Sequence, residues 1–224
     1  MTTPHTPAFP VRADALMDDS GSAFDRAEIT TAPMDQADMG LDVDAVVEGI
    51  RKTEPVIACA LETMRAFGLR ESEAIQLQPR VSDKGDYLLV YRGTKGGKPR
   101  TVPFSKDPER LAWQKSVLAT AKEHSNAHPQ GLLALEGVTL GQMKNRLRHV
   151  LRGNVARSGA VVTPHSLRSQ YATDLFRELT GLSAPVLRQL PQHVYAKHQA
   201  PVHAALVEIS RRLGHERPRF LGPI

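Results

Sequence analysis

Three short segments of the sequence place arginine or histidine at the end of a predicted helix, beside a glycine or proline that sets the backbone. A guanidinium group keeps its positive charge and binds two phosphate oxygens at once, and a histidine donates hydrogen bonds or transfers a proton. Taken singly, each segment is more typical of a helix cap with a solvated charge than of a functional site. The residues concerned are Arg70, His165, Arg168 and His215.

The charge of the chain is unevenly distributed. Residues 1–40 contain seven acidic and two basic residues, a net charge of −5, which leaves 27 basic and 17 acidic residues, a net charge of +10, in residues 41–224. A basic body of this kind favours a polyanionic partner, with nucleic acid as the leading candidate. The alternative is a domain with an ordinary surface rich in lysine and arginine.

In their order along the chain, four segments resemble the catalytic domain of the tyrosine recombinase, or phage integrase, family. The family motifs are a G-L-R-x-x-E segment, a lysine in a β-hairpin, an H-x-L-R helix start and an L-G-H segment. The resemblance covers about residues 43–224, and the stretch of about 181–205 is similar to an insert in integrases of mobile genetic elements. The matching segments are 68–73, 92–103 with Lys95, 165–168 and 213–215.

The resemblance implies DNA integration by recombination, in which a side-chain hydroxyl attacks a DNA phosphodiester. Arg70 and Arg168 would bind the non-bridging oxygens, where negative charge develops in the transition state. His165 and His215 would donate hydrogen bonds to the same phosphate or take the proton of the nucleophile. Lys95, in a glycine-rich loop, would protonate the leaving 5′-oxygen.

Glu73 lies one helical turn after Arg70, and the resemblance implies that it orients the arginines. The alternative is a carboxylate on a helix surface. No metal ion and no cofactor are implied, because the arginines supply the positive charge. The implied partner is double-stranded DNA, bound by a multimer of recombinase subunits, with no small-molecule substrate.

Six further basic residues are predicted to bind the DNA backbone: two in the hairpin, three on the predicted helix over 140–151 and one directly after it. Contacts of this kind position a protein on DNA without reading its sequence. For the helix, the alternative is a solvated face. The six are Lys98, Arg100, Lys144, Arg146, Arg148 and Arg152.

The family nucleophile is a tyrosine that follows the L-G-H histidine by a little over two helical turns, and this position falls at Ile224. Of the tyrosines in the chain, Tyr171 is predicted to pack in the core, and Tyr195 is the one conceivable substitute. Covalent cleavage cannot begin without a nucleophile. We therefore expect a DNA-binding domain that is inactive or impaired alone, without the separate N-terminal DNA-binding domain of the family. The alternatives are a tyrosine supplied in trans and a non-enzymatic DNA-binding or regulatory module.

The fold that must position these residues is predicted to be α+β and mainly α, with helices around a small antiparallel hairpin. Residues 1–40 are predicted to form an acidic, disordered tail, and residues 41–224 an integrase-like domain. The stretch 181–201 is predicted to be irregular because prolines interrupt it. Helices are predicted over 43–67 with a break at Pro55, and over 72–77, 108–121, 140–151, 165–179 and 202–213, with strands over 87–91 and 100–104.

The composition excludes several classes of protein. No apolar run approaches the ~18 residues of a membrane-spanning helix, and the N-terminus does not resemble a signal peptide. A single cysteine, Cys59, excludes an internal disulfide framework and a cysteine-rich metal site. We therefore expect a cytoplasmic protein without a membrane partner, associated with the nucleoid if the host is a prokaryote.

Overall fold

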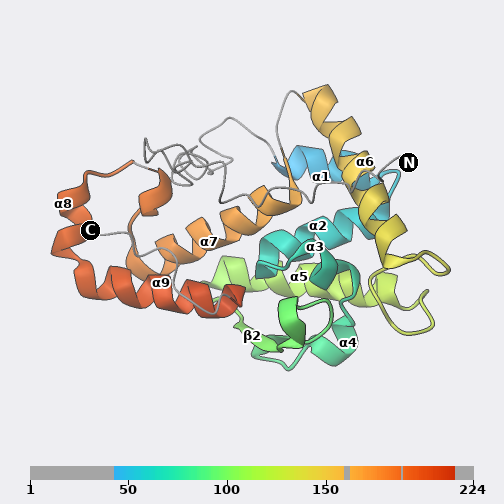
Figure 1. Ribbon diagram of the computed structural model, residues 1–224, viewed down its shortest axis with the longest axis horizontal. Helices are drawn as coiled ribbons and strands as arrows, with labels where there is room; N and C mark the ends of the chain where they lie inside the picture. The colour runs from blue at the N-terminus through green and yellow to red at the C-terminus, as the bar shows by residue number, and fades with distance from the viewer. Residues whose placement is uncertain (1–42, 159–161, 188, 215–224) are drawn as a thin grey trace, which may run out of the picture. The chain divides into compact units, whose positions relative to one another are not determined.

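The computed structural model describes residues 43–158, 162–187 and 189–214, and Figure 1 shows the elements that they form. The chain divides into two units, Met1–Ala32 and Pro33–Ile224, and all described residues belong to the second unit. The predicted tail over residues 1–40 lies outside the described residues, as do His215 and Ile224.

A proline and a glycine set the bounds of the first helices. Helix α1 spans Val43–Arg51 and helix α2 spans Pro55–Phe67, so the predicted break falls just before Pro55. Proline suits the first position of a helix because its missing N–H has no partner there. Gly68 ends α2 in the left-handed conformation, with φ 61°. Two short helices follow, α3 (Glu71–Ile75) and α4 (Pro79–Ser82), of which α4 was not predicted.

The predicted hairpin is confirmed. Strand β1 (Tyr87–Val90) pairs with strand β2 (Arg100–Pro103) in antiparallel register, and the facing residues Leu88 and Val102 are both fully buried. The connecting loop contains a short 3-10 helix, η3 (Lys95–Gly97). This sheet of two strands lies against helix α9 and, through β1, against α4.

Three longer helices follow the hairpin: α5 (Pro108–Ser125), α6 (Leu140–Ser158) and α7 (Pro164–Thr180). Asp107 caps α5 by accepting a hydrogen bond from the Arg110 backbone N–H at 2.8 Å. The start of α7 is fixed by a reciprocal cap, in which the side chains of Thr163 and Ser166 each accept a hydrogen bond from the other residue's backbone N–H. This cap sets the orientation of the first turns of α7, where His165 and Arg168 lie.

The prediction that residues 181–201 are irregular is wrong. This stretch contains the 3-10 helix η4 (Pro185–Leu187), helix α8 (Gln192–Lys197) and the start of helix α9 (Gln199–Leu213). Pro191 precedes the first residue of α8, and Pro201 lies in the first turn of α9. At both places a proline removes no helical hydrogen bond, because the N–H groups of a first turn have no partner within the helix. Here the prolines mark helix starts.

The core is built around α2, which packs against α1, α5 and α7 (Figure 1). Its residues Ile57, Leu61, Met64 and Phe67 are fully buried. Burying side chains of this size contributes roughly 1.5–3 kcal/mol each. The C-terminal end of α2 is therefore held in place against α7. No helix in the described part of the chain is long and apolar enough to cross a membrane. The predicted α+β, mainly α fold is confirmed.

Candidate functional site

Glu73 lies at the centre of the predicted site, with its side chain fully buried. One carboxylate oxygen, Oε2, accepts the backbone N–H of Arg70 at 2.6 Å, and the other, Oε1, accepts Arg70 Nη1 at 2.8 Å. Arg100 donates from Nη1 to Oε1 and from Nη2 to Oε2, the latter at 2.7 Å. Burial alone would raise the pKa of Glu73, but hydrogen bonds and positive charge from Arg100 and Arg70 lower it.

Among the predicted catalytic residues that the structure describes, Arg168 is the most enclosed. Its Nη1 donates to the carbonyl of Gly68 and its Nη2 to the carbonyl of Leu213, and Nη1 lies 3.8 Å from the Glu73 carboxylate. The two carbonyls end helices α2 and α9, where the helix dipole concentrates negative charge. Burial, followed by the positive charges of Arg70 and Arg100, lowers the pKa of Arg168 to about 9.

The structure therefore brings together Arg70, Glu73, Arg100 and Arg168, which we call the arginine cluster. Arg70 also donates from Nη2 to the carbonyl of Gly214 at 3.2 Å. Gly214 directly precedes His215 in the sequence. Residues from α3, β2, α7 and the end of α9 meet at this one place.

The placement of Arg100 differs from the exposed position that a DNA-backbone contact implies. Its side chain is only 7% exposed, and its guanidinium group is turned toward Glu73. The residue lies two positions before Val102 on strand β2, so that both side chains lie on the same face of the sheet. This alternation is a sequence signal that could have identified Arg100 as an inward residue. No local pattern in the sequence identifies its partner Glu73, which lies 27 residues away in the chain.

His165 and the two lysines of the hairpin loop are exposed. His165 is the second residue of α7, and Arg168 follows it one helical turn later. Lys95 and Lys98 lie on the loop that leads into β2, which begins at Arg100. The loop is thus attached to the arginine cluster at its end, while Lys95 itself is accessible to solvent.

The predicted basic face of α6 is partly paired with acidic residues. Arg146 makes a two-point ion pair with Glu54, the shortest contact being 2.7 Å. Arg148 makes a similar pair with Glu71, at 2.9 and 2.6 Å. Hydrogen bonds and negative charge from these carboxylates raise the pKa of both arginines. The other two members of this predicted face are the half-buried Lys144 and the exposed Arg152.

The four tyrosine side chains of the chain lie in different surroundings. Tyr171 is buried in the core, as predicted. The Tyr195 hydroxyl donates to the Ser183 carbonyl at 3.0 Å, and burial raises its pKa. The Tyr91 hydroxyl donates to Gln78, and Tyr87 is exposed on β1. None of these contacts links Tyr195 to a residue of the arginine cluster.

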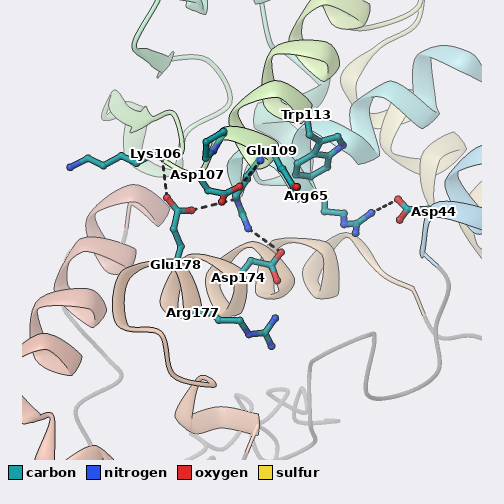
Figure 2. A pocket seen from close by; sticks show the side chains of 11 residues that line it. Asp44, Arg65, Lys106, Asp107, Glu109, Trp113, Asp174, Arg177 and Glu178 are labelled. Atoms are coloured by element: carbon teal, nitrogen blue, oxygen red, sulfur yellow. Dashed lines mark hydrogen bonds and ion pairs between the residues drawn. The ribbon is translucent and has the colours of Figure 1, made fainter.

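A pocket of about 1120 Å³ lies elsewhere, between the start of α5, the second half of α7 and residues from α1 and α2 (Figure 2). Its lining is polar and largely paired: Arg65 contacts Asp44, and Arg110 lies 3.3 Å from Asp174. None of the predicted site residues lines it. Within the described residues, no group of three or more His, Cys, Asp or Glu side chains is arranged to hold a metal ion.

The amino-acid sequence is similar to those of known proteins. A family model described as integrase matches residues 27–174, more than half of the chain. The tyrosine recombinase XerC of Mycobacterium sp. (strain KMS) is 32% identical over 179 residues, covering 72% of this chain and 58% of that protein. The tyrosine recombinase XerA of Thermococcus kodakarensis is 30% identical over 152 residues, covering 66% of this chain and 50% of that protein.

A solved structure of a lambda integrase tetramer bound to a Holliday junction is similar with a TM-score of 0.48 at 16% identity, covering 82% of this chain and 48% of that chain. The chain thus spans about half the length of the proteins that it matches.

Proposed function

The chain belongs to the integrase family of tyrosine recombinases, and we propose that its arginine cluster binds a DNA phosphodiester during strand exchange. We further propose that residues 41–224 act as one integrase-like domain behind an acidic tail over residues 1–40. Its place of action would be duplex DNA in the cytoplasm, at the nucleoid of a prokaryotic host, within a multimer of recombinase subunits.

The observation that supports this proposal is an excess of positive charge. In the described part of the chain, the ion pairs of Arg70, Arg100 and Arg168 all end on one carboxylate, Glu73. Three guanidinium groups against one carboxylate leave a net charge of +2 in a largely buried place. The pKa of Arg168 is lowered first by burial and then by repulsion from Arg70 and Arg100. A bound anion would relieve this repulsion.

The charge suits the proposed reaction. A phosphodiester has one negative charge, and the five-coordinate phosphorane formed by nucleophilic attack has two. A preorganised net charge of +2 therefore stabilises the phosphorane more than the bound substrate, which is the requirement for catalysis. Arg70 and Arg168 would contact the non-bridging oxygens. His165 and His215 would act at the same phosphate, and Lys95, on its accessible loop, would protonate the leaving oxygen.

Titration of DNA binding against salt tests the proposal. Purified protein is mixed with fluorescent duplex DNA, and Kd is measured between about 50 and 200 mM salt, a range over which phosphate contacts weaken strongly. We expect Arg70→Ala to weaken binding about tenfold, as the loss of a charge-assisted hydrogen bond would. The matched control is Arg51→Ala, which removes an arginine paired with Glu48 and Glu62 on α1 and α2. Equal losses in both variants would contradict a specific phosphate site.

A second candidate function is DNA binding without cleavage. The observation that favours it is that the hydroxyl of Tyr195 is hydrogen-bonded within the protein and that Tyr171 lies in the core. A nicked suicide DNA substrate separates the two functions, because a covalent tyrosine–phosphate intermediate resists SDS. An adduct requires strand-cleaving activity by a tyrosine of this chain. Salt-sensitive binding without an adduct supports the binding function, or a tyrosine supplied by another subunit.

A further inference from the structure

We propose that Arg100 is a positioning residue of this site: it holds Glu73 and, through Glu73, the guanidinium group of Arg70, and it makes no contact with DNA. This inference rests on the proposed function, because the effect of positioning is measured on DNA. It assigns Arg100 a task other than backbone binding.

The guanidinium group of Arg100 is fully engaged in hydrogen bonds within the protein. Its Nε donates to the Arg212 carbonyl at 2.7 Å, its Nη1 to Glu73, and its Nη2 to Glu73 at 2.7 Å and to the Gly68 carbonyl at 3.5 Å. All three nitrogen atoms therefore donate inward. The aliphatic part packs closely as well, since a Cβ atom on Gly214 would lie 3.0 Å from Arg100 Cδ.

Arg100 and Arg70 share one carboxylate partner, Glu73. Each oxygen of Glu73 accepts one hydrogen bond from Arg70 and one from Arg100. The carboxylate plane is thereby fixed between the two residues. Without the fork of Arg100, the Glu73 carboxylate could rotate, and Arg70 would lose the fixed acceptor that sets its direction.

Arg100 also connects segments that lie far apart in the sequence. It extends from β2 to the ends of α2 and α9 through the carbonyls of Gly68 and Arg212, and side chains of α9 reinforce the second link. Arg211 donates to the Thr101 hydroxyl at 3.3 Å, and Arg212 Nη1 donates to the Pro103 carbonyl at 3.3 Å. Strand β2 therefore holds in place the C-terminal end of α9, which ends at Leu213, two residues before His215.

A double-mutant cycle on DNA affinity tests this proposal. Arg100→Lys keeps the positive charge but removes the planar fork, so a loss of affinity cannot come from lost charge. We expect a loss of about tenfold in Arg100→Lys and in Arg70→Ala, the size expected for one charge-assisted hydrogen bond. If Arg100 acts through Arg70, the double variant binds as weakly as Arg70→Ala alone, because the two effects are not independent.

The outcomes that overturn the proposal are additive losses, which would show Arg100 to contact DNA itself, and unchanged affinity in Arg100→Lys. The control for a general structural effect is Arg110→Lys. This arginine is also largely buried and ion-paired, with Asp174 and Glu178, but it lies at the pocket of Figure 2 outside the arginine cluster. We expect its Tm to fall while its DNA affinity stays within about twofold of the parent protein.

A readout without DNA separates failure of this inference from failure of the proposed function. The backbone N–H of Arg70, which donates to Glu73 at 2.6 Å, is followed by hydrogen exchange in NMR spectra. We expect this amide to exchange about tenfold faster in Arg100→Lys than in the parent protein or in Arg110→Lys. If the parent protein does not bind DNA, the proposed function fails, and this exchange rate alone decides the positioning role. An unchanged rate overturns it.

Discussion

The ring of Tyr171 occupies the space that a side chain on residue 68 would need. A Cβ atom placed on Gly68 would lie 2.5 Å from Cδ1 and 2.9 Å from Cε1 of this ring. The close approach of α2 and α7 at this point brings the Gly68 carbonyl within reach of Arg168. Gly68 therefore meets two requirements at once: it ends α2 with φ 61°, and it makes room for the helix that holds a predicted catalytic arginine.

We expect Gly68→Ala to lower the free energy of unfolding by about 2–4 kcal/mol, from left-handed backbone strain and overpacking combined. The matched control is Gly181→Ala, where φ is 70° but no atom lies within 4 Å of the added Cβ. That variant bears the backbone term alone, about 1–2 kcal/mol. Urea unfolding followed by circular dichroism measures both, and equal losses would show that the contact with Tyr171 adds no cost.

Glu208 should make stability depend on acid pH. Hydrogen bonds from Arg211, and then from Arg212, lower the pKa of Glu208 to about 2, although burial opposes this. A carboxylate with a lowered folded-state pKa stabilises the fold fully above its ordinary value of about 4.3, and this contribution is lost as the pH falls toward 2. We expect Glu208→Gln to lower the free energy of unfolding by up to about 1 kcal/mol above pH 5 and by much less near pH 2, where about half of the Glu208 carboxylates of the folded protein are protonated.

Thermal unfolding between pH 2 and pH 7 measures this difference. Glu136→Gln, which changes an exposed glutamate, provides the control. A difference between Glu208→Gln and the parent protein that stays constant across the whole range would rule out the ion pairs with α9 arginines as its cause.

Tyr195 should behave as a structural residue. Its hydroxyl is bound to the Ser183 carbonyl, so Tyr195→Phe removes one hydrogen bond and should lower the free energy of unfolding by about 1 kcal/mol. DNA affinity and any adduct with a suicide substrate should be unchanged. Tyr87→Phe, at an exposed position on β1, is the matched control. An adduct that forms in the parent protein and disappears only in Tyr195→Phe would identify Tyr195 as the nucleophile.

The ion pairs of α6 should weaken its contribution to DNA binding. Glu54→Gln releases Arg146 from its carboxylate partner, and we expect DNA affinity at low salt to rise about threefold with a steeper salt dependence. Glu62→Gln removes the same charge but takes one of two carboxylate partners from Arg51 on α1, which keeps its pair with Glu48. Fluorescence anisotropy with one DNA duplex compares the two variants. Equal gains would assign the effect to net charge rather than to a phosphate contact of α6.

Local signals in the sequence were sufficient for most of the elements. Pro55 and Gly68 mark the two ends of α2, and the glycine-rich loop with its flanking strands predicted the hairpin. The error over residues 181–201 arose because a proline favours the start of a helix but breaks its middle. The period of the surrounding apolar residues does not distinguish these two positions over so short a stretch.

The interior of the site was less accessible to sequence reasoning. The family motifs identified Arg70 and Arg168, and the structure places both beside Glu73. The bonds from Arg168 to two helix ends depend on residues 100 and 45 positions away, which no local pattern encodes. Arg100 was assigned to the surface for the same reason: its partners are set by tertiary packing.

The two carbonyl contacts of Arg168 have a consequence for how such genes change over time. This guanidinium group joins the end of α2 to the end of α9, so replacing it would leave two helix ends without their donor. Selection for a folded protein alone is then enough to preserve the arginine, even in a lineage that has stopped cutting DNA. The presence of this arginine in a related sequence therefore indicates that the fold is kept. Whether the DNA-cleaving activity is kept has to be measured directly.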